Sequence, residues 1–99
     1  MKLVLFHEEA EAELDAAVDY YEQIREGLGV DLQNQVEHAI GLIRQNPHLF
    51  PQHNPLGIQK CLLKRFPYTI FFLEFNQYIW VVAVTHQKRK PGYWKNRVV

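Results

Sequence analysis

Two apolar segments in the second half of the chain, residues 68–75 and 78–86, most constrain what it can fold into. Both are rich in β-branched and aromatic residues, a composition that suits a pleated, half-buried surface. Only Asn76 and Gln77 separate them. A two-residue connection joins antiparallel neighbours, and Asn tolerates the left-handed conformation that such turns use. The sequence therefore predicts a β-hairpin, preceded by a third strand over residues 58–64.

The first half of the chain has mainly helical periodicity. After a short apolar segment at residues 2–6, interpreted as a strand, apolar residues recur at helical spacing from Glu8 onward. Acidic residues fill the first turns, where the helix dipole favours negative charge. Gly27 and Gly29 are expected to break this helix, and a second helix should follow until Pro47 ends it. Two helices with so short a connection predict an antiparallel helical hairpin.

The predicted elements follow one another in the order β-α-α-β-β-β. This order indicates an α+β fold in which the helical hairpin packs on one face of a largely antiparallel sheet. Residues 48–57, which include Pro51, Asn54 and Pro55, are expected to be an irregular connector. The 99 residues suffice for one domain over residues 1–99, and no internal repeat indicates a second.

The composition excludes several classes of protein. Apolar residues make up 47% of the chain, which is typical of a folded domain and too many for a disordered segment. The longest apolar run, residues 78–84, is far shorter than the roughly 20 residues that cross a bilayer. The N-terminus does not resemble a secretory signal, and Cys61 alone cannot form an internal disulfide. We therefore expect a cytoplasmic protein with a buried Cys61, and no motif predicts a metal site or a cofactor.

Charge is strongly polarised along the chain, although the net charge is zero. Residues 1–60 hold ten acidic and four basic residues, whereas residues 61–99 hold one acidic and seven basic residues. Five of those seven cations lie in a basic-aromatic C-terminal tail, residues 86–99, together with Tyr93 and Trp94. The basic end is therefore the candidate surface for meeting an anionic partner.

Three basic segments are expected to meet at one margin of the sheet. Lys64 and Arg65 end one predicted strand, His86 ends another, and Arg89 and Tyr93 follow in the tail. Histidine transfers protons near neutral pH, and tyrosine does so when nearby cations lower its pKa. Fixed cations stabilise the charge that develops on a phosphorane. Arg65, His86, Arg89 and Tyr93 are therefore the catalytic candidates for RNA cleavage without a metal.

Structural roles are open for the same residues. Arg65 can pair at a strand end with an acid of the first helix, and His86 can cap the sheet edge by hydrogen bonding. Tyr93 and Trp94 can fold back over the open end of the core, and Trp94 suits that role better because its indole has no proton to exchange in catalysis. Lys88, Arg89, Lys90 and Lys95 can form a solvated loop, and most acids of the first helix are expected to form its solvent face.

A set of ordered motifs covers nearly the whole chain. They are residues 13–22 with Glu13-Leu14 and Tyr20-Tyr21-Glu22, Gly27-Leu28-Gly29, residues 43–51 (IRQNPHLFP), residues 63–70 (LKRFPYTI) and residues 82–94 (VAVTHQKRKPGYW). In order and spacing the chain resembles the RelE/ParE superfamily of toxins from type II toxin–antitoxin modules. The resemblance implies the same β-α-α-β-β-β fold. It also implies a growth inhibitor of the plasmid-stabilisation type, which a cognate antitoxin wraps and silences.

The superfamily holds two biochemistries. RelE-like members cleave mRNA in the ribosomal A site, whereas ParE-like members bind and poison DNA gyrase. In cleaving members a strand arginine follows the tyrosine that matches Tyr68, and a basic residue lies six positions before the tyrosine that matches Tyr93. This chain has Thr69 and Gln87 at those positions, and Lys60 offers a basic counterpart on the neighbouring strand.

These departures, together with the zero net charge, favour a ParE-like toxin that binds gyrase and is not an enzyme. The alternative is a RelE-like, ribosome-dependent endoribonuclease that needs no metal. The antitoxin is expected to carry an amphipathic, acidic segment that lies across the basic sheet end or in the groove beside the helical hairpin. The residues expected to contact the target or the antitoxin are Lys60, Lys64, Arg65, Lys88, Arg89, Lys90, Tyr93 and Trp94.

Overall fold

The computed structural model describes residues 2–53 and 57–98, so Asn54 and Pro55 of the expected connector lie outside the described residues. The predicted α+β class and the order β-α-α-β-β-β are confirmed. No helix among the described residues is long and apolar enough to cross a membrane. The elements are β1 (Leu3–Phe6), α1 (Glu8–Ile24), α2 (Leu28–Gln45), the 3-10 helix η1 (Pro47–Leu49), β2 (Gln59–Leu62), β3 (Tyr68–Glu74), β4 (Tyr78–His86) and the 3-10 helix η2 (Lys95–Arg97).

The four strands form one sheet in the order β1-β4-β3-β2. The pairs β2–β3 and β3–β4 are antiparallel, as predicted, whereas β1 lies parallel to β4. The register between β3 and β4 shifts at Phe71 and Phe72, where β4 contains a bulge. β1 pairs only with the first part of β4, from Tyr78 to Val81. The second part of β4 therefore has no strand beside it on the β1 side.

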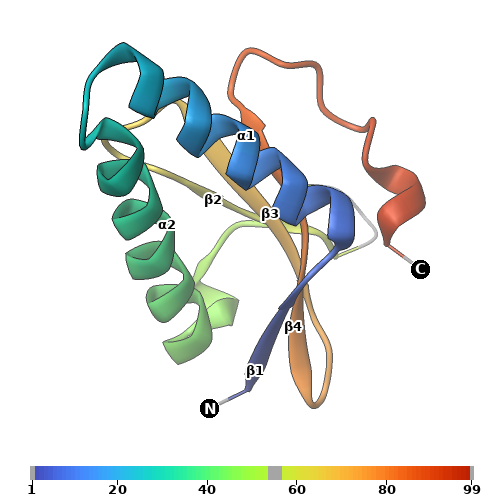
Figure 1. Cartoon of the computed structure of the whole chain (residues 1–99). Coiled ribbons are helices and arrows are strands. Elements are labelled where there is room, and N and C mark those ends of the chain that lie inside the picture. The colour runs from blue at the N-terminus through green and yellow to red at the C-terminus, as the bar shows by residue number, and fades with distance from the viewer. Residues whose placement is uncertain (1, 54–56, 99) are drawn as a thin grey trace.

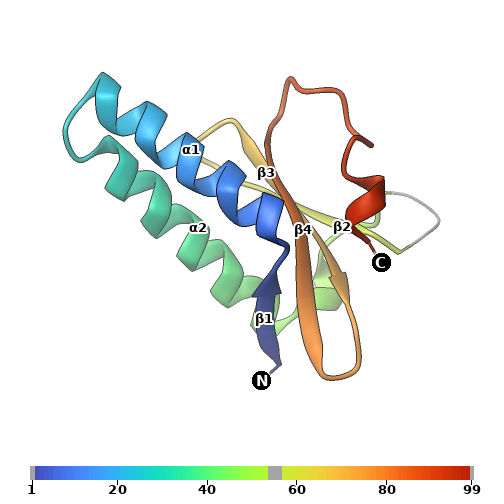
Figure 2. The same cartoon turned by 45° about the vertical axis from the view of Figure 1, so that its right-hand side comes forward.

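Both faces of the sheet are covered, which explains why β3 and β4 are apolar at nearly every position. α1 and α2 lie side by side on one face, where they pack against Ile70 and Phe72 (Figures 1 and 2). The C-terminal tail crosses the other face, where Trp94 packs against Phe71 and Val82. Trp94 is fully buried. The tail thus supplies a second apolar layer, in addition to the helical layer that the sequence predicted.

The connection between the helices differs from the prediction at Gly29. α1 ends at Ile24, and Gly27 takes a φ of +88° directly before α2. Gly29 was expected to lie in the break, but it belongs to α2 and lies where the two helices come close together. A Cβ atom at Gly29 would be 2.5 Å from the carbonyl oxygen of Val18. The side chain of Glu22 closes the turn by accepting hydrogen bonds from the N–H groups of both glycines, at 2.8 and 2.9 Å.

The hairpin turn between β3 and β4 lies at Asn76 and Gln77, as predicted. The N–H group of Phe75 donates to the carbonyl oxygen of Tyr78 at 2.9 Å and closes the turn. The expectation of a left-handed Asn76 is wrong, because only glycines have positive φ among the described residues.

A methyl group added at Gly29 should test the close packing of the two helices. Gly29→Ala is expected to lower the free energy of unfolding by about 1–3 kcal/mol, because the extra methyl forces the helices apart. Gly41→Ala is the matched control, since a Cβ there meets no atom within 4 Å. It should raise the free energy of unfolding by about 0.5–1 kcal/mol through helix propensity. Urea denaturation measures both, and equal effects at the two positions would contradict the close approach.

Candidate functional site

The basic end of the sheet, where β4 continues into the tail, has two hollows that lie on either side of the strand end. Thr85, His86 and Arg89 border both of them. The tail-side hollow, of about 220 Å³, is lined by His53, Lys60, Leu62, Thr69, Phe71, Thr85, His86, Gln87, Arg89 and Pro91. The helix-side hollow, of about 250 Å³, is lined by Glu13, Ala16, Ala17, Tyr20, Tyr68, Val84, Thr85, His86 and Arg89.

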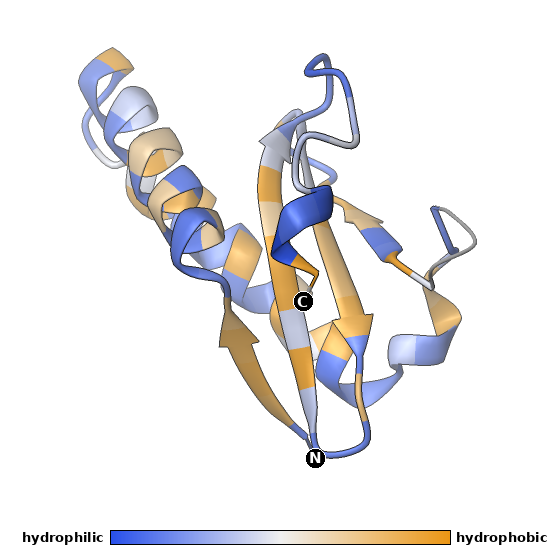
Figure 3. Ribbon diagram, turned by 90° about the vertical axis from the view of Figure 1, so that its right-hand side faces the viewer, coloured by the Kyte–Doolittle hydropathy of each residue, from blue (hydrophilic) through white to orange (hydrophobic). Residues whose placement is uncertain are grey.

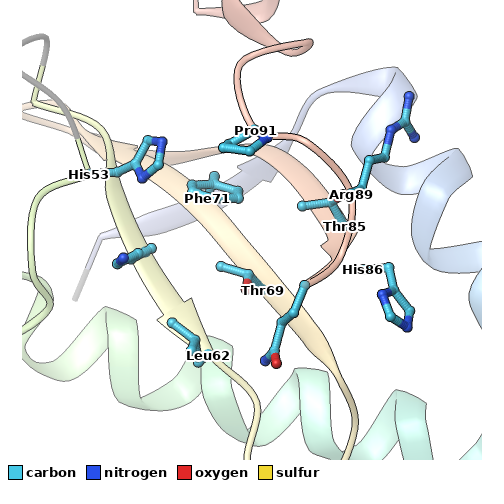
Figure 4. Close-up of a pocket in the computed structure, with 10 residues that line it drawn as sticks. His53, Leu62, Thr69, Phe71, Thr85, His86, Arg89 and Pro91 are labelled. Carbon is cyan, nitrogen blue, oxygen red and sulfur yellow. The ribbon is translucent and has the colours of Figure 1, made fainter.

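The side chains that line the tail-side hollow point in different directions. Figure 4 shows His53 and Pro91 on one side of the tail-side hollow, with His86 and Arg89 extending past β4 toward α1. The ring of His86 packs edge-on against Tyr68, with the two ring centres 5.4 Å apart. The Nδ1 atom of His86 accepts a hydrogen bond from the N–H group of Lys88 at 3.1 Å, which orders the start of the tail.

One carboxylate of α1 binds β4 and the tail together. Oε1 of Glu13 accepts hydrogen bonds from the N–H group of Val84 at 3.1 Å and from the guanidinium of Arg97 at 2.9 Å. Oε2 of Glu13 accepts a hydrogen bond from the hydroxyl of Tyr93 at 2.7 Å and lies 3.9 Å from the guanidinium of Arg89. We call these five residues the Glu13 cluster. The side chain of Glu13 is only 16% exposed, so Glu13 is an exception to the solvent-facing position expected of most acids in this helix.

The Glu13 cluster forms where β4 has no strand neighbour. β1 pairs with β4 only as far as Val81, so the backbone groups beyond it need other partners. Glu13 accepts from the N–H group of Val84, and Arg97 donates to the carbonyl oxygen of Val82 at 3.1 Å. The ion pair therefore replaces hydrogen bonds that a neighbouring strand would make.

Arg97 is the cation that compensates the buried charge of Glu13. The side chain of Arg97 is 10% exposed. Burial lowers the pKa of this guanidinium, but the hydrogen bond and charge of Glu13, aided by Glu9, outweigh the burial and raise the pKa overall. The Nε atom of Arg97 lies 3.4 Å from the carboxylate of Glu9. Arg97 therefore stays charged, and neither Glu13 nor Arg97 was predicted from the sequence as a site residue.

Tyr93 is positioned by the same cluster. Burial is the largest effect on its phenol and raises its pKa, as does Glu13, whereas Thr85 and Arg89 lower it. The guanidinium of Arg89 stacks on the ring, 3.6 Å from its centre. The phenol donates its hydrogen bond to Glu13, and the raised pKa keeps it protonated near neutral pH, so its basic form is scarcely populated. This arrangement supports a structural role for Tyr93.

Lys64 and Arg65 lie apart from both hollows. β2 ends at Leu62, two residues earlier than predicted, so both cations belong to the turn before β3. A guanidinium nitrogen of Arg65 lies 3.1 Å from Asp31 at the start of α2, so its partner acid comes from the second helix and not from the first. Lys60, by contrast, lines the tail-side hollow. Of the four catalytic candidates, His86 and Arg89 line both hollows, whereas Arg65 and Tyr93 line neither.

The tail residues predicted to contact a partner differ in exposure. Lys88, Arg89 and Lys90 are exposed and Tyr93 is half-buried. Trp94 is fully buried, so its indole offers no surface, which conflicts with its prediction as a partner contact. Among residues 2–53 and 57–98, no group of three or more His, Cys, Asp or Glu side chains could hold a metal ion.

A third hollow, of about 360 Å³, lies between the two helices. Its apolar lining consists of Phe6, Leu14, Val36 and Ile40. Its polar lining consists of Glu11, Asp15, Gln33 and Glu37. Every charge in this lining is therefore negative.

Comparisons with known proteins agree with the architecture. A family sequence model described as "ParE toxin of type II toxin-antitoxin system, parDE" matches residues 4–91. A solved structure described as "Chromosomal ParDE TA system from P. aeruginosa" has the same fold, with a TM-score of 0.75 at 19% identity, and the match covers 87% of this chain and 96% of that one. No curated protein matches the chain significantly. Glu13 lies within the residues that the family matches, whereas Tyr93 and Arg97 follow them.

Glu13→Gln should show how strongly the tail depends on one charge. The change removes the closer and more buried of the two carboxylates that pair with Arg97, and we expect the free energy of unfolding to fall by about 3–5 kcal/mol. The matched control is Arg65→Gln, which removes the ion pair with Asp31. Because the Arg65 side chain is 54% exposed, its removal should cost no more than about 1 kcal/mol. Chemical denaturation compares the variants, and similar losses in both would contradict a dominant role for Glu13.

The raised pKa of Tyr93 predicts a loss of stability in alkali. The folded chain keeps the phenol proton to higher pH than the unfolded chain does, so this contribution to stability is complete below about pH 10. It is lost as the pH rises through the folded pKa. Tyr93→Phe should reduce the alkaline fall in stability without abolishing it, because burial also raises the pKa of Tyr68 and Cys61. Denaturation at a series of pH values tests this, and an unchanged slope would contradict it.

Proposed function

The chain belongs to the ParE toxin family of type II toxin–antitoxin systems, and on that premise we propose that it inhibits growth by binding DNA gyrase in the cytoplasm. The observation that carries this choice over RNA cleavage is the separation of the catalytic candidates. Arg65 pairs with Asp31 away from both hollows, and the hydroxyl of Tyr93 donates its hydrogen bond to Glu13. A toxin that acts by binding needs no such set of groups.

The proposed contact surface is the basic end of the sheet. It presents Lys60 beside the tail-side hollow and Lys88, Arg89 and Lys90 on the exposed start of the tail. Arg89 is 56% exposed although its guanidinium stacks on Tyr93, so its charge is held in place at the surface. Fixed cations of this kind favour an acidic patch on a protein partner and speed its encounter.

The proposal includes a cognate antitoxin that neutralises the toxin with an acidic segment. Of the two places considered for that segment, the basic sheet end is the better one. The groove between α1 and α2 carries Glu11, Asp15 and Glu37, which would repel an acidic segment. An antitoxin that covers Lys88 and Arg89 would also block the surface proposed for gyrase.

Ribosome-dependent RNA cleavage is a second candidate function, and one observation favours it. His86 and Arg89 border the same two hollows, so a proton-transfer group and a cation are close to each other. Thr69, where cleaving relatives carry a strand arginine, is buried and adds no charge. His86 and Arg89 are therefore fewer groups than metal-free RNA cleavage requires.

A supercoiling assay tests the gyrase proposal directly. Purified chain at micromolar concentration should inhibit gyrase and trap its cleavage complex with DNA. The double reversal Lys88→Glu/Lys90→Glu should weaken inhibition by roughly tenfold or more, because it replaces attraction by repulsion at the contact. The matched control is Arg25→Glu. Arg25 is exposed between the two helices, away from the proposed contact, so this variant should inhibit gyrase as the parent does.

Growth arrest in cells without any effect on supercoiling would contradict gyrase as the target. Primer extension on translated mRNA then tests the alternative, for which codon-phased cuts are expected. In that case Tyr93→Phe and Arg89→Ala should slow cleavage by orders of magnitude. Cleavage at the parental rate in both variants would show that neither residue belongs to the catalytic site.

A pull-down with the product of the adjacent reading frame tests the antitoxin. We expect a stable complex that the Lys88→Glu/Lys90→Glu variant forms at least roughly tenfold more weakly than the parent, since charge complementarity is lost. The Arg25→Glu variant should bind like the parent. A neighbouring product that does not bind the toxin would contradict neutralisation by that protein.

A further inference from the structure

The tail-side hollow is a basic cavity over a sheet face that is otherwise apolar. Figure 3 shows β3 and β4 as mainly hydrophobic and the loop that follows β4 as hydrophilic. The floor of the hollow crosses three strands, because Leu62 pairs with Thr69 and Thr69 pairs with Thr85. Lys60 lies one row further along β2, paired with Phe71. The described residues that line the hollow include two fixed cations and no carboxylate, so the hollow suits an anion.

Lys60 brings to this hollow a charge that has no partner in the described part of the chain. Its side chain is half-buried, and its ammonium group makes no ion pair or hydrogen bond there. Other half-buried cations are paired: Lys2 binds Glu74, and Arg44 donates to the carbonyl oxygen of Lys2. Partial burial of an uncompensated charge costs free energy, which an anion in the hollow would offset.

The hydroxyl of Thr85 is a second unsatisfied group at the hollow. Thr85 is 5% exposed, and its Oγ1 atom has no hydrogen-bond partner among the described residues. Burial raises the pKa of Tyr93 and Thr85 lowers it in part, so the two hydroxyls are near each other, but they form no hydrogen bond of good geometry. A buried hydroxyl without a partner is costly, and the hollow gives this one access to a ligand.

Two other nitrogen-bearing side chains around the hollow are already engaged. The guanidinium of Arg89 stacks on the ring of Tyr93 and lies 3.9 Å from the carboxylate of Glu13. The Nδ1 atom of His86 accepts a backbone hydrogen bond from the tail. Lys60 therefore remains as the fixed cation available to a ligand.

We propose that the tail-side hollow binds the carboxylate of a glutamate or aspartate side chain from a protein partner. Lys60 and Thr85 lie two strands apart, about 10 Å across the sheet, so their ammonium and hydroxyl groups approach the carboxylate from opposite sides. Leu62, Phe71 and Pro91 provide an apolar wall for the methylene groups of that side chain. This wall favours a carboxylate on a short hydrocarbon stem over a free phosphate.

The size of the hollow agrees with a single side chain as the ligand. Its volume of about 220 Å³ is below the roughly 300–1,000 Å³ of pockets that hold drug-sized molecules. The carboxylate would come from the acidic segment proposed for the antitoxin, so only its source rests on the proposed function. Lys88 and Lys90, exposed at the start of the tail, would guide that segment to the hollow.

An NMR titration of the ¹⁵N-labelled full chain tests the site without any protein partner. The probe is glutamate blocked at its α-amino and α-carboxyl groups, so that the side chain carries the only charge. We expect saturable shifts of the amide signals of Thr69 and Thr85, with a dissociation constant in the millimolar range. Blocked glutamine, which has the same shape without the charge, should bind at least roughly tenfold more weakly.

Three outcomes of the titration overturn the proposal. They are the absence of saturable shifts at the hollow, equal binding of the two blocked amino acids, and tighter binding of inorganic phosphate than of blocked glutamate. The last outcome would assign the hollow to phosphate groups. Each leaves the gyrase assay unaffected, and an inactive chain in that assay leaves the titration unaffected.

Two variants separate binding from stability. Lys60→Met keeps an apolar stem without the ammonium group and should weaken the binding of blocked glutamate at least roughly tenfold. Thr85→Val removes a hydroxyl that has no partner in the free chain, so the urea midpoint should stay the same or rise while binding weakens severalfold. The matched control is Lys64→Met, which removes an exposed lysine outside the hollow and should bind as the parent does. Parental affinity in both Lys60→Met and Thr85→Val would overturn the assignment.

Discussion

The ion pair between Glu13 and Arg97 is the interaction on which the arrangement of β4 and the tail depends. β4 extends beyond β1, and its backbone beyond Val81 would otherwise have no partner on that side. The pair supplies the hydrogen bonds of Val82 and Val84 and fastens the tail across the sheet. With the tail in place, Trp94 covers the second apolar face of the sheet. Arg89 at the start of the tail also lies against this cluster, through Glu13 and the ring of Tyr93.

The order of elements was predictable from the sequence because helical and strand periodicity are local properties. The Glu13 cluster was not, because its members lie up to 84 positions apart. One signal was nevertheless present: Glu13 shares the helical spacing of Ala10, Leu14 and Ala17, all of which are buried. An acid on the buried side of a helix requires a cation from elsewhere, and the sequence does not say which. The prediction for Gly29 was wrong for a similar reason, because Gly29 is needed for the contact between two helices and not for the local break in the chain.

The candidate site was predicted in part. His86, Arg89 and Lys60 do lie around neighbouring hollows at the basic end, because adjacent strand ends bring them together. Arg65 does not, because β2 ends before it and the turn carries it to α2. Membership of the ParE family fixes the class of protein. The fold alone does not choose a target, so the choice between binding gyrase and cleaving RNA depends on these side chains.

A double-mutant cycle on Glu13 and Arg97 tests the central claim most directly. Glu13→Gln and Arg97→Met would be made singly and together, and their free energies of unfolding measured by urea denaturation. Because the two groups stabilise each other, the double variant should lose little more than the worse single variant, with a coupling energy of about 2 kcal/mol or more. Losses that add to within about 0.5 kcal/mol would mean that the pair does not hold the tail on the sheet.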